Sequence, residues 1–177
     1  MVTWQCTIWQ RLHRWDAWIT QKMHLPPGHP LRWLVVVGAH LGDGPLWLGL
    51  WAAGWLYWRQ RPDLQRGILT WVASAILAAV VTYIIKFAVK RPRPRQVAGF
   101  YSQRYDAHAF PSGHATRMGT VALWGSALFP GWQPAFWGIS LWCALSRVTL
   151  GVHYLGDVVA GFLIGALVSW GMMMVGG

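Results

Sequence analysis

The sequence contains little negative charge. It has no glutamate, and charged residues of both signs make up 11% of the 177-residue chain, against about 25% in an average soluble domain. Apolar residues make up 55%, and 15 tryptophans are among them. These values exclude an ordinary soluble domain. We expect a protein of the lipid bilayer, with the length of a single domain.

Cysteine is scarce as well. Cys6 and Cys143 lie far apart, which argues against a disulfide framework or a cysteine-based zinc site. Cys143 falls in an apolar run and is expected to be a buried, inert thiol. We expect no secretory signal peptide, because charged residues interrupt residues 1–24.

Positive charge is abundant, with 15 Lys and Arg residues and a formal net charge of +10. Such an excess indicates an anionic partner. No RNA- or DNA-binding pattern is visible, so we expect no nucleic acid and favour lipid headgroups. The sequence indicates no obligatory protein partner.

Several long apolar segments predict an all-α fold, an integral membrane helical bundle of about five spans. They cover residues 43–58, 67–89, 113–129, 133–149 and 155–175. Several are shorter than the ~20 residues of an upright span. The first span can extend back through residues 31–41.

The N-terminal part, residues 1–41, is expected to form interfacial helices ahead of the bundle at 43–177. Apolar residues between 4 and 19 recur at helical spacing, with cationic neighbours, which is typical of a helix lying in the membrane interface. An amphipathic helix packed on protein is the alternative. The four tryptophans on one face of the first span are expected to face lipid: Trp47, Trp51, Trp55 and Trp58.

Ionisable residues gather at particular ends of the apolar segments, where they are usually functional. If each segment crosses once, the chain near residues 90, 111, 149 and 155 emerges on one face of the membrane. The groups at these ends are compatible with phosphate: Lys86, Arg91, Arg93, Ser112, Gly113, His114, Arg147, His153 and Asp157.

The basic residues of this set can hold a phosphate group. Arg93 and Arg147 offer fork-shaped donors, and Lys86 adds a point charge. Backbone N–H groups of Ser112 and Gly113, near a helix N-terminus, form an anion site. Phosphoryl transfer depends mainly on such positioning and charge stabilisation.

The remaining members of the set can perform the chemistry. His153 and Asp157 are four residues apart and share a helix face. Asp157 can then accept from one ring nitrogen and leave the other to attack phosphorus, with His114 as general acid. Taken singly, His153 could be a core residue and Arg147 a structural counter-ion. All the phosphate-compatible groups would then have to lie on one face of the membrane by coincidence.

Three motifs resemble those of the type 2 phosphatidic acid phosphatase family. They are Lys86 followed after six residues by Arg93-Pro94, then 110–114 (FPSGH), then Ser146-Arg147 with His153 and Asp157. The resemblance runs from about residue 31 to the C-terminus. It implies a metal-free lipid phosphatase without cofactors, a phosphohistidine at His153, support from Asp157 and acid catalysis by His114.

The substrate class implied by this resemblance is a lipid phosphate or diphosphate, such as phosphatidic acid, phosphatidylglycerol phosphate or undecaprenyl diphosphate. A lipid-to-lipid phosphotransferase would use the same site. A non-enzymatic anionic-lipid transporter would not need the His153–Asp157 pair. We expect the bacterial cytoplasmic membrane, with the site on its extracytoplasmic face, although the positive-inside rule favours the opposite face.

Several residues have open roles. Arg91-Pro92 offers a second way to match an Arg-Pro pair with Lys86, so Arg91 is a further candidate for phosphate contact. Arg117 is expected to pair with Asp43 or Asp106, or else to snorkel at the surface. His40 and His108 are possible extra contacts of the site. Gly161 and Gly165 form a small-residue pair that is expected to let two helices approach closely.

Overall fold

The computed structural model describes residues 3–95 and 107–176. Every regular element in these ranges is a helix. The elements are α1 (Thr3–Met23), α2 (Arg32–His40), α3 (Gly44–Tyr57), α4 (Pro62–Val89), α6 (Gly113–Leu128), the 3-10 helix η1 (Pro130–Trp132), α7 (Gln133–Thr149) and α8 (Leu155–Gly176). The predicted all-α class is confirmed.

Each of the five predicted spans corresponds to one helix, but the helices differ in length. In the described part of the chain, α4 and α8 are long and apolar enough to cross a membrane. Helices α2 and α3 reach that length together, as one span bent by 57°. Helices α6 and α7 have 16 and 17 residues, fewer than the ~20 of an upright span. The helical membrane bundle is confirmed, and the count of five spans is not.

The bend between α2 and α3 follows from the local sequence. Asp43 is extended, with φ −68° and ψ 138°, and Pro45 occupies the first turn of α3. Proline suits the start of a helix because its missing N–H would have no helical partner there. The chain therefore ends one helix at His40 and begins another at Gly44.

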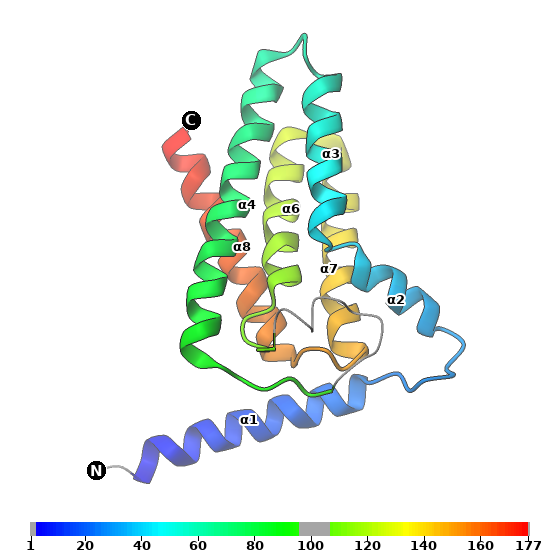
Figure 1. Ribbon diagram of the computed structural model, residues 1–177, viewed down its shortest axis with the longest axis vertical. Helices are drawn as coiled ribbons and strands as arrows, with labels where there is room; N and C mark the ends of the chain where they lie inside the picture. The colour runs from blue at the N-terminus through cyan, green and yellow to red at the C-terminus, as the bar shows by residue number, and fades with distance from the viewer. Residues whose placement is uncertain (1–2, 96–106, 177) are drawn as a thin grey trace.

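The bundle brings one set of helix ends together. Figure 1 shows α3, α4, α6, α7 and α8 side by side, with α1 lying across one end of the bundle. The end of α4, the beginning of α6, the end of α7 and the beginning of α8 all lie at this end. One crossing per segment predicts this arrangement.

Close contact between α6 and α8 depends on glycine. A Cβ atom at Gly161 would overlap the carbonyl oxygen of Ser112, and one at Gly165 would overlap that of Thr116. On the facing helix, a Cβ at Gly119 would overlap the carbonyl oxygen of Phe162. The predicted role of Gly161 and Gly165 in close helix packing is confirmed.

The predicted lipid-facing tryptophan stripe is wrong for its first half. Trp47 and Trp51 are each 7% exposed and pack against Trp71 of α4 in the main hydrophobic cluster. Trp58 packs against the same cluster, whereas Trp55 is 39% exposed. The half of the stripe formed by Trp47 and Trp51 faces α4, since an apolar helix face can pack in a protein core as well as it can face lipid.

Candidate active site

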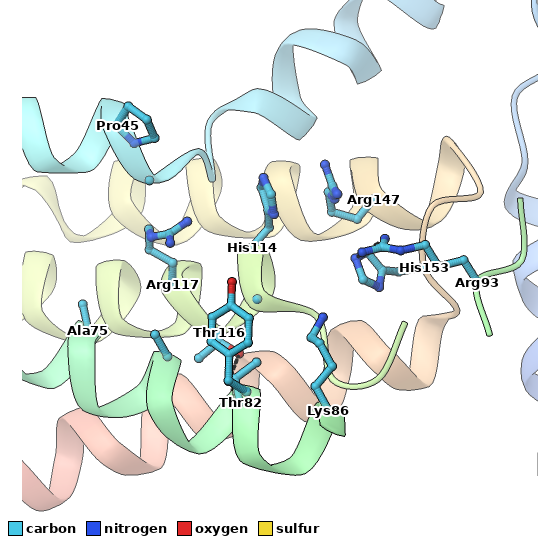
Figure 2. Close-up of a pocket in the computed structure, with 14 residues that line it drawn as sticks. Pro45, Ala75, Thr82, Lys86, Arg93, His114, Thr116, Arg117, Arg147 and His153 are labelled. Carbon is cyan, nitrogen blue, oxygen red and sulfur yellow. Dashed lines mark hydrogen bonds between the residues drawn. The ribbon is translucent and has the colours of Figure 1, made fainter. Parts of the chain in front are cut away.

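A cavity of about 240 Å³ opens between α3, α4, α6 and α7 at the end of the bundle where the motifs meet. Figure 2 shows its lining, with His153 and Arg93 at one end and Pro45 and Ala75 at the other. Its cationic and imidazole side chains are Lys86, Arg93, Arg117, Arg147, His114 and His153. No acidic side chain is among the described residues that line it. The cavity is suited to an anion.

Two of the cations are held by the ends of helices. Lys86 lies in the last turn of α4, is 2% exposed, and donates from Nζ to the carbonyl oxygen of His108 at 3.1 Å. Arg147 lies in the last turn of α7 and is fully buried. Buried cations on rigid helix ends keep their charge directed at the cavity, where it acts more strongly than in water.

His153 lies in the turn between α7 and α8 and is 1% exposed. Its Nδ1 lies 2.8 Å from the carbonyl oxygen of Ala109. A carbonyl oxygen can only accept, so Nδ1 carries the proton and the neutral ring keeps its lone pair on Nε2. Nε2 in turn lies 3.1 Å from Nη1 of Arg93, at the cavity. Burial, followed by the charges of Arg147, Arg93 and Lys86, lowers the pKa of His153 well below its usual 6.5.

The predicted direct hydrogen bond from His153 to Asp157 is not formed. Oδ2 of Asp157 lies 3.7 Å from Nδ1 of His153 and instead accepts from the backbone N–H of Tyr154 at 2.8 Å. The carboxylate lies in the first turn of α8, where it satisfies a backbone donor just ahead of that helix. The carbonyl of Ala109 takes the position that the sequence assigns to Asp157.

His114 opens α6 and is joined to two residues outside the motifs. Its Nε2 lies 2.8 Å from Oδ1 of Asp43, and Oδ2 of Asp43 lies 2.8 Å from Nδ1 of His40. Arg117 donates to the carbonyl oxygen of Gly42. Arg117 thus contacts the backbone of the residue before Asp43, while the Asp43 carboxylate lies against the two histidines. The pairing of Arg117 with Asp43 stays a prediction. The alternative partner, Asp106, lies outside the described residues.

At the start of α6, one of the two backbone N–H groups predicted to bind an anion has a partner within the protein. The backbone N–H of Ser112 donates to the carbonyl oxygen of Asp157 at 2.9 Å, and its Oγ accepts from Ala115 as the N-cap of α6. Ser112 is fully buried. Gly113, in contrast, lines the cavity and has no atom within 4 Å of where a Cβ would lie. Gly113 is thus the residue at which backbone can approach a phosphate.

Arg91 does not line this cavity, which corrects its predicted phosphate contact. Its guanidinium donates to Asp157 at 2.7 Å and to Asp16 of α1 at 2.7 Å. Arg93, two residues later, lines the cavity and reaches His153. The register that pairs Lys86 with Arg93 is the one that brings both to the cavity.

Two residues next to the site are absent from the sequence prediction. The carbonyl of Ala109 is a backbone group, so its side chain gives no signal. Asp16 gives a signal, because it is one of only five acidic residues in a chain of net charge +10.

His108, a predicted possible site contact, does not line the cavity; its side chain packs near the ring of Phe87. Within the described ranges, no three His, Cys, Asp or Glu side chains are grouped as metal ligands.

The chain resembles known proteins in sequence and in fold. A family described as the PAP2 superfamily matches residues 67–176. The chain is 31% identical to a lipid A 1-phosphatase of Rhizobium etli, over 62% of this chain and 52% of that protein. It is 34% identical to a decaprenylphosphoryl-5-phosphoribose phosphatase of Mycobacterium tuberculosis, over 78% of this chain and 77% of that protein. It spans about half the length of the Rhizobium relative.

A solved structure has the same fold. It is the crystal structure of a transmembrane PAP2-type phosphatidylglycerolphosphate phosphatase from Bacillus subtilis, with a TM-score of 0.74 and 22% identity. The similarity covers 94% of this chain and 86% of that one. The family match covers more than half of the chain and contains the residues from Lys86 to Asp157 that form the cavity and its surroundings. The chain therefore belongs to the PAP2 superfamily.

Proposed function

We propose that the protein is an integral membrane enzyme that hydrolyses a lipid phosphate ester or diphosphate through a phosphohistidine at His153, without a metal ion or other cofactor. One observation carries the proposal. The unprotonated Nε2 of His153 lies at a cavity lined by four cationic side chains. A nucleophile and a phosphate-binding surface thus occur together.

The first chemical step forms the covalent intermediate. Nε2 of His153 attacks phosphorus, a P–N bond forms, and the P–O bond to the lipid breaks. Arg93, Arg147 and Lys86 stabilise the charge on the phosphoryl oxygens. His114 gives a proton to the departing lipid oxygen, and Asp43 at 2.8 Å stabilises the protonated ring.

The second step releases phosphate. Water attacks phosphorus, the P–N bond breaks, and His114 takes the proton of the attacking water. The imidazole of His153 returns to its starting form, with Nδ1 still donating to the carbonyl of Ala109. Neither step changes an oxidation state, and His114 carries the proton in both steps, so the proposed cycle returns both histidines to their starting forms.

The shape of the cavity favours a lipid over a soluble phosphate. Its volume of about 240 Å³ is below the ~300–1,000 Å³ of pockets that enclose whole small ligands, so it fits a headgroup. Pro45 of α3 and Ala75 of α4 line its side away from His153 (Figure 2), and Ala79 and Tyr83 of α4 also belong to its lining. An apolar chain attached to the bound phosphate would pass between α3 and α4.

The names of the relatives agree with this substrate class, since both are phosphatases of lipid-linked phosphates. Phosphatidic acid, phosphatidylglycerol phosphate and undecaprenyl diphosphate are the candidates that we propose to compare. We also propose that residues 1–177 form one domain in a bacterial cytoplasmic membrane. Residues 1–41 would lie at the interface, and the cavity would open to the extracytoplasmic side.

A phosphate-release assay tests the function. The purified full-length protein is incubated with each candidate lipid under excess chelator, and inorganic phosphate and lipid products are measured. We expect release from at least one lipid, loss of release in His153→Ala, and inhibition by vanadate, which mimics a five-coordinate phosphorus.

The same assay includes the outcomes that contradict the proposal. A strict requirement for a divalent metal ion, or full activity in His153→Ala, would rule out the mechanism. Transfer of phosphate to a second lipid, with no inorganic phosphate released, would identify a phosphotransferase. Lipid binding without turnover in the wild type would identify a non-enzymatic lipid-binding protein.

A further inference from the structure

Helix α1 supplies contacts at the turn that carries His153. Asp16 uses both carboxylate oxygens there: Oδ1 accepts from the backbone N–H of Gly156 at 2.8 Å, and Oδ2 accepts from Arg91 at 2.7 Å. Thr20, one helical turn further along α1, accepts from the backbone N–H of Leu155 at 3.1 Å and is 4% exposed. A helix remote in sequence is therefore bonded to the start of α8.

These bonds replace the usual helix cap. Helix α8 begins at Leu155, and the first N–H groups of a helix have no partner within it. Such donors are normally satisfied by a side chain just before the helix. Here the side chains of Asp16 and Thr20 satisfy two of them from another helix. The negative charge of Asp16 also suits the positive end of the α8 dipole.

Arg91 extends the connection to Asp157. Its guanidinium lies between two carboxylates, with Nη1 2.7 Å from Asp157 and Nη2 2.7 Å from Asp16. It also lies 4.0 Å from the ring centroid of Tyr154, which is the residue between His153 and α8. Asp16 thus contacts the turn that carries His153 both through the backbone N–H of Gly156 and through a partly buried chain of ion pairs.

We infer that Asp16 is a positioning residue for the phosphatase reaction: acting through Arg91 and the N–H of Gly156, it fixes the orientation of Asp157 and of the turn that holds His153. The inference rests on the proposed function of His153. Asp16 touches none of the residues that line the cavity in the described structure, so its effect is on alignment and not on phosphate binding.

The kinetic test compares Asp16→Asn with the matched variant Asp63→Asn. Asp63 is an exposed aspartate that pairs with Arg61 at the start of α4, the opposite end of that helix from Lys86. Asparagine keeps an acceptor for Gly156 but removes the charge that Arg91 faces. We expect kcat of Asp16→Asn to fall about tenfold with KM within twofold, and Asp63→Asn to match the wild type.

Two further variants keep the test decisive. Asp16→Glu retains the charge, so we expect it to fold even if Asp16→Asn does not. Its extra methylene shifts the carboxylate against Arg91, so we expect kcat to fall, but by less than in Asp16→Asn. In a double-mutant cycle, Asp16→Asn should add little to Arg91→Gln, because both act through one chain of contacts. Unchanged kcat in both Asp16 variants, with His153→Ala inactive, overturns the inference.

Hydrogen exchange tests the coupling without using activity. We expect the amide of Gly156 to exchange about tenfold faster in Asp16→Ala than in Asp63→Ala, since Asp16→Ala removes the side chain that accepts from this amide and so opens the first turn. Equal exchange rates overturn the inference. If the wild type releases no phosphate but exchange is faster, the proposed function fails while the α1–α8 coupling remains.

Discussion

Nη1 of Arg93 lies 3.1 Å from Nε2 of His153 and 3.1 Å from the carbonyl oxygen of Val152, the residue before it. One guanidinium therefore holds the backbone of the nucleophile's turn and faces the nitrogen lone pair. When a phosphoryl group is bound at this nitrogen, the same N–H groups can donate to its oxygens. In the proposed mechanism, Arg93 thus orients His153 before the reaction and would bind the phosphoryl group afterwards.

Replacement of Arg93 by lysine should reduce activity although the charge remains. Lysine offers a point charge in place of a planar fork, and hydrogen bonds to charged groups contribute about 1.5–3 kcal/mol. We expect Arg93→Lys to lower kcat/KM about tenfold to a hundredfold. The control is Arg95→Lys, at an exposed position two residues later. Equal activity of the two variants would contradict the assigned role.

The role of His114 can be separated from that of His153 by the leaving group. General acids contribute about 10²–10⁴-fold, but only where the departing oxygen needs a proton. We expect His114→Ala to lower kcat/KM by about this factor for an alkyl lipid phosphate and far less for p-nitrophenyl phosphate. His153→Ala should abolish turnover of both. An equal loss in His114→Ala for the two substrates would show that His114 is not the acid.

The pKa of His153 sets an expectation for pH. Burial and the nearby cations lower this pKa below 6.5, so the folded protein keeps the ring neutral where the unfolded chain binds a proton. This group therefore reduces the free energy of unfolding as the pH falls below 6.5. NMR titration of the ring, identified by comparison with His153→Ala, should give a midpoint below 6.5. A midpoint at or above 6.5 would contradict the described surroundings.

Glycines in α8 provide a test of the bundle itself. Gly165→Ala should destabilise the protein by about 1–3 kcal/mol through overpacking, because its methyl group would overlap the backbone of Thr116. Gly171→Ala in the same helix has open space around it and should be neutral or slightly stabilising. Thermal unfolding in detergent measures both. Similar melting temperatures would show that α6 and α8 are not in such close contact.

Much of this architecture could be predicted from the sequence. Apolar length and periodicity predict the helices, and one crossing per segment predicts which ends meet. That argument brings Lys86, Arg93, His114, Arg147 and His153 to one cavity, as the structure has them. The close packing of α8 at Gly161 and Gly165 is predicted by the four-residue spacing of these glycines alone. These features depend on local patterns and on connectivity.

Other features depend on contacts between distant residues that no local pattern encodes. Trp47 and Trp51 have the same spacing whether their helix face meets lipid or α4. The four-residue spacing of His153 and Asp157 predicts a shared helix face, but His153 lies just before α8 begins. Its Nδ1 therefore meets the carbonyl of Ala109. The motif spacing favours Arg93 over Arg91 for phosphate contact, but it does not predict that Arg91 binds Asp16 of α1 and Asp157.

Direct detection of the phosphoenzyme tests the central claim. The protein is mixed with its radiolabelled lipid phosphate under chelator and quenched within the first turnover, and peptides are analysed by mass spectrometry. We predict acid-labile, alkali-stable phosphate on residue 153, and none in His153→Ala. Rapid turnover with no label on His153, or with label on another residue, would contradict the account.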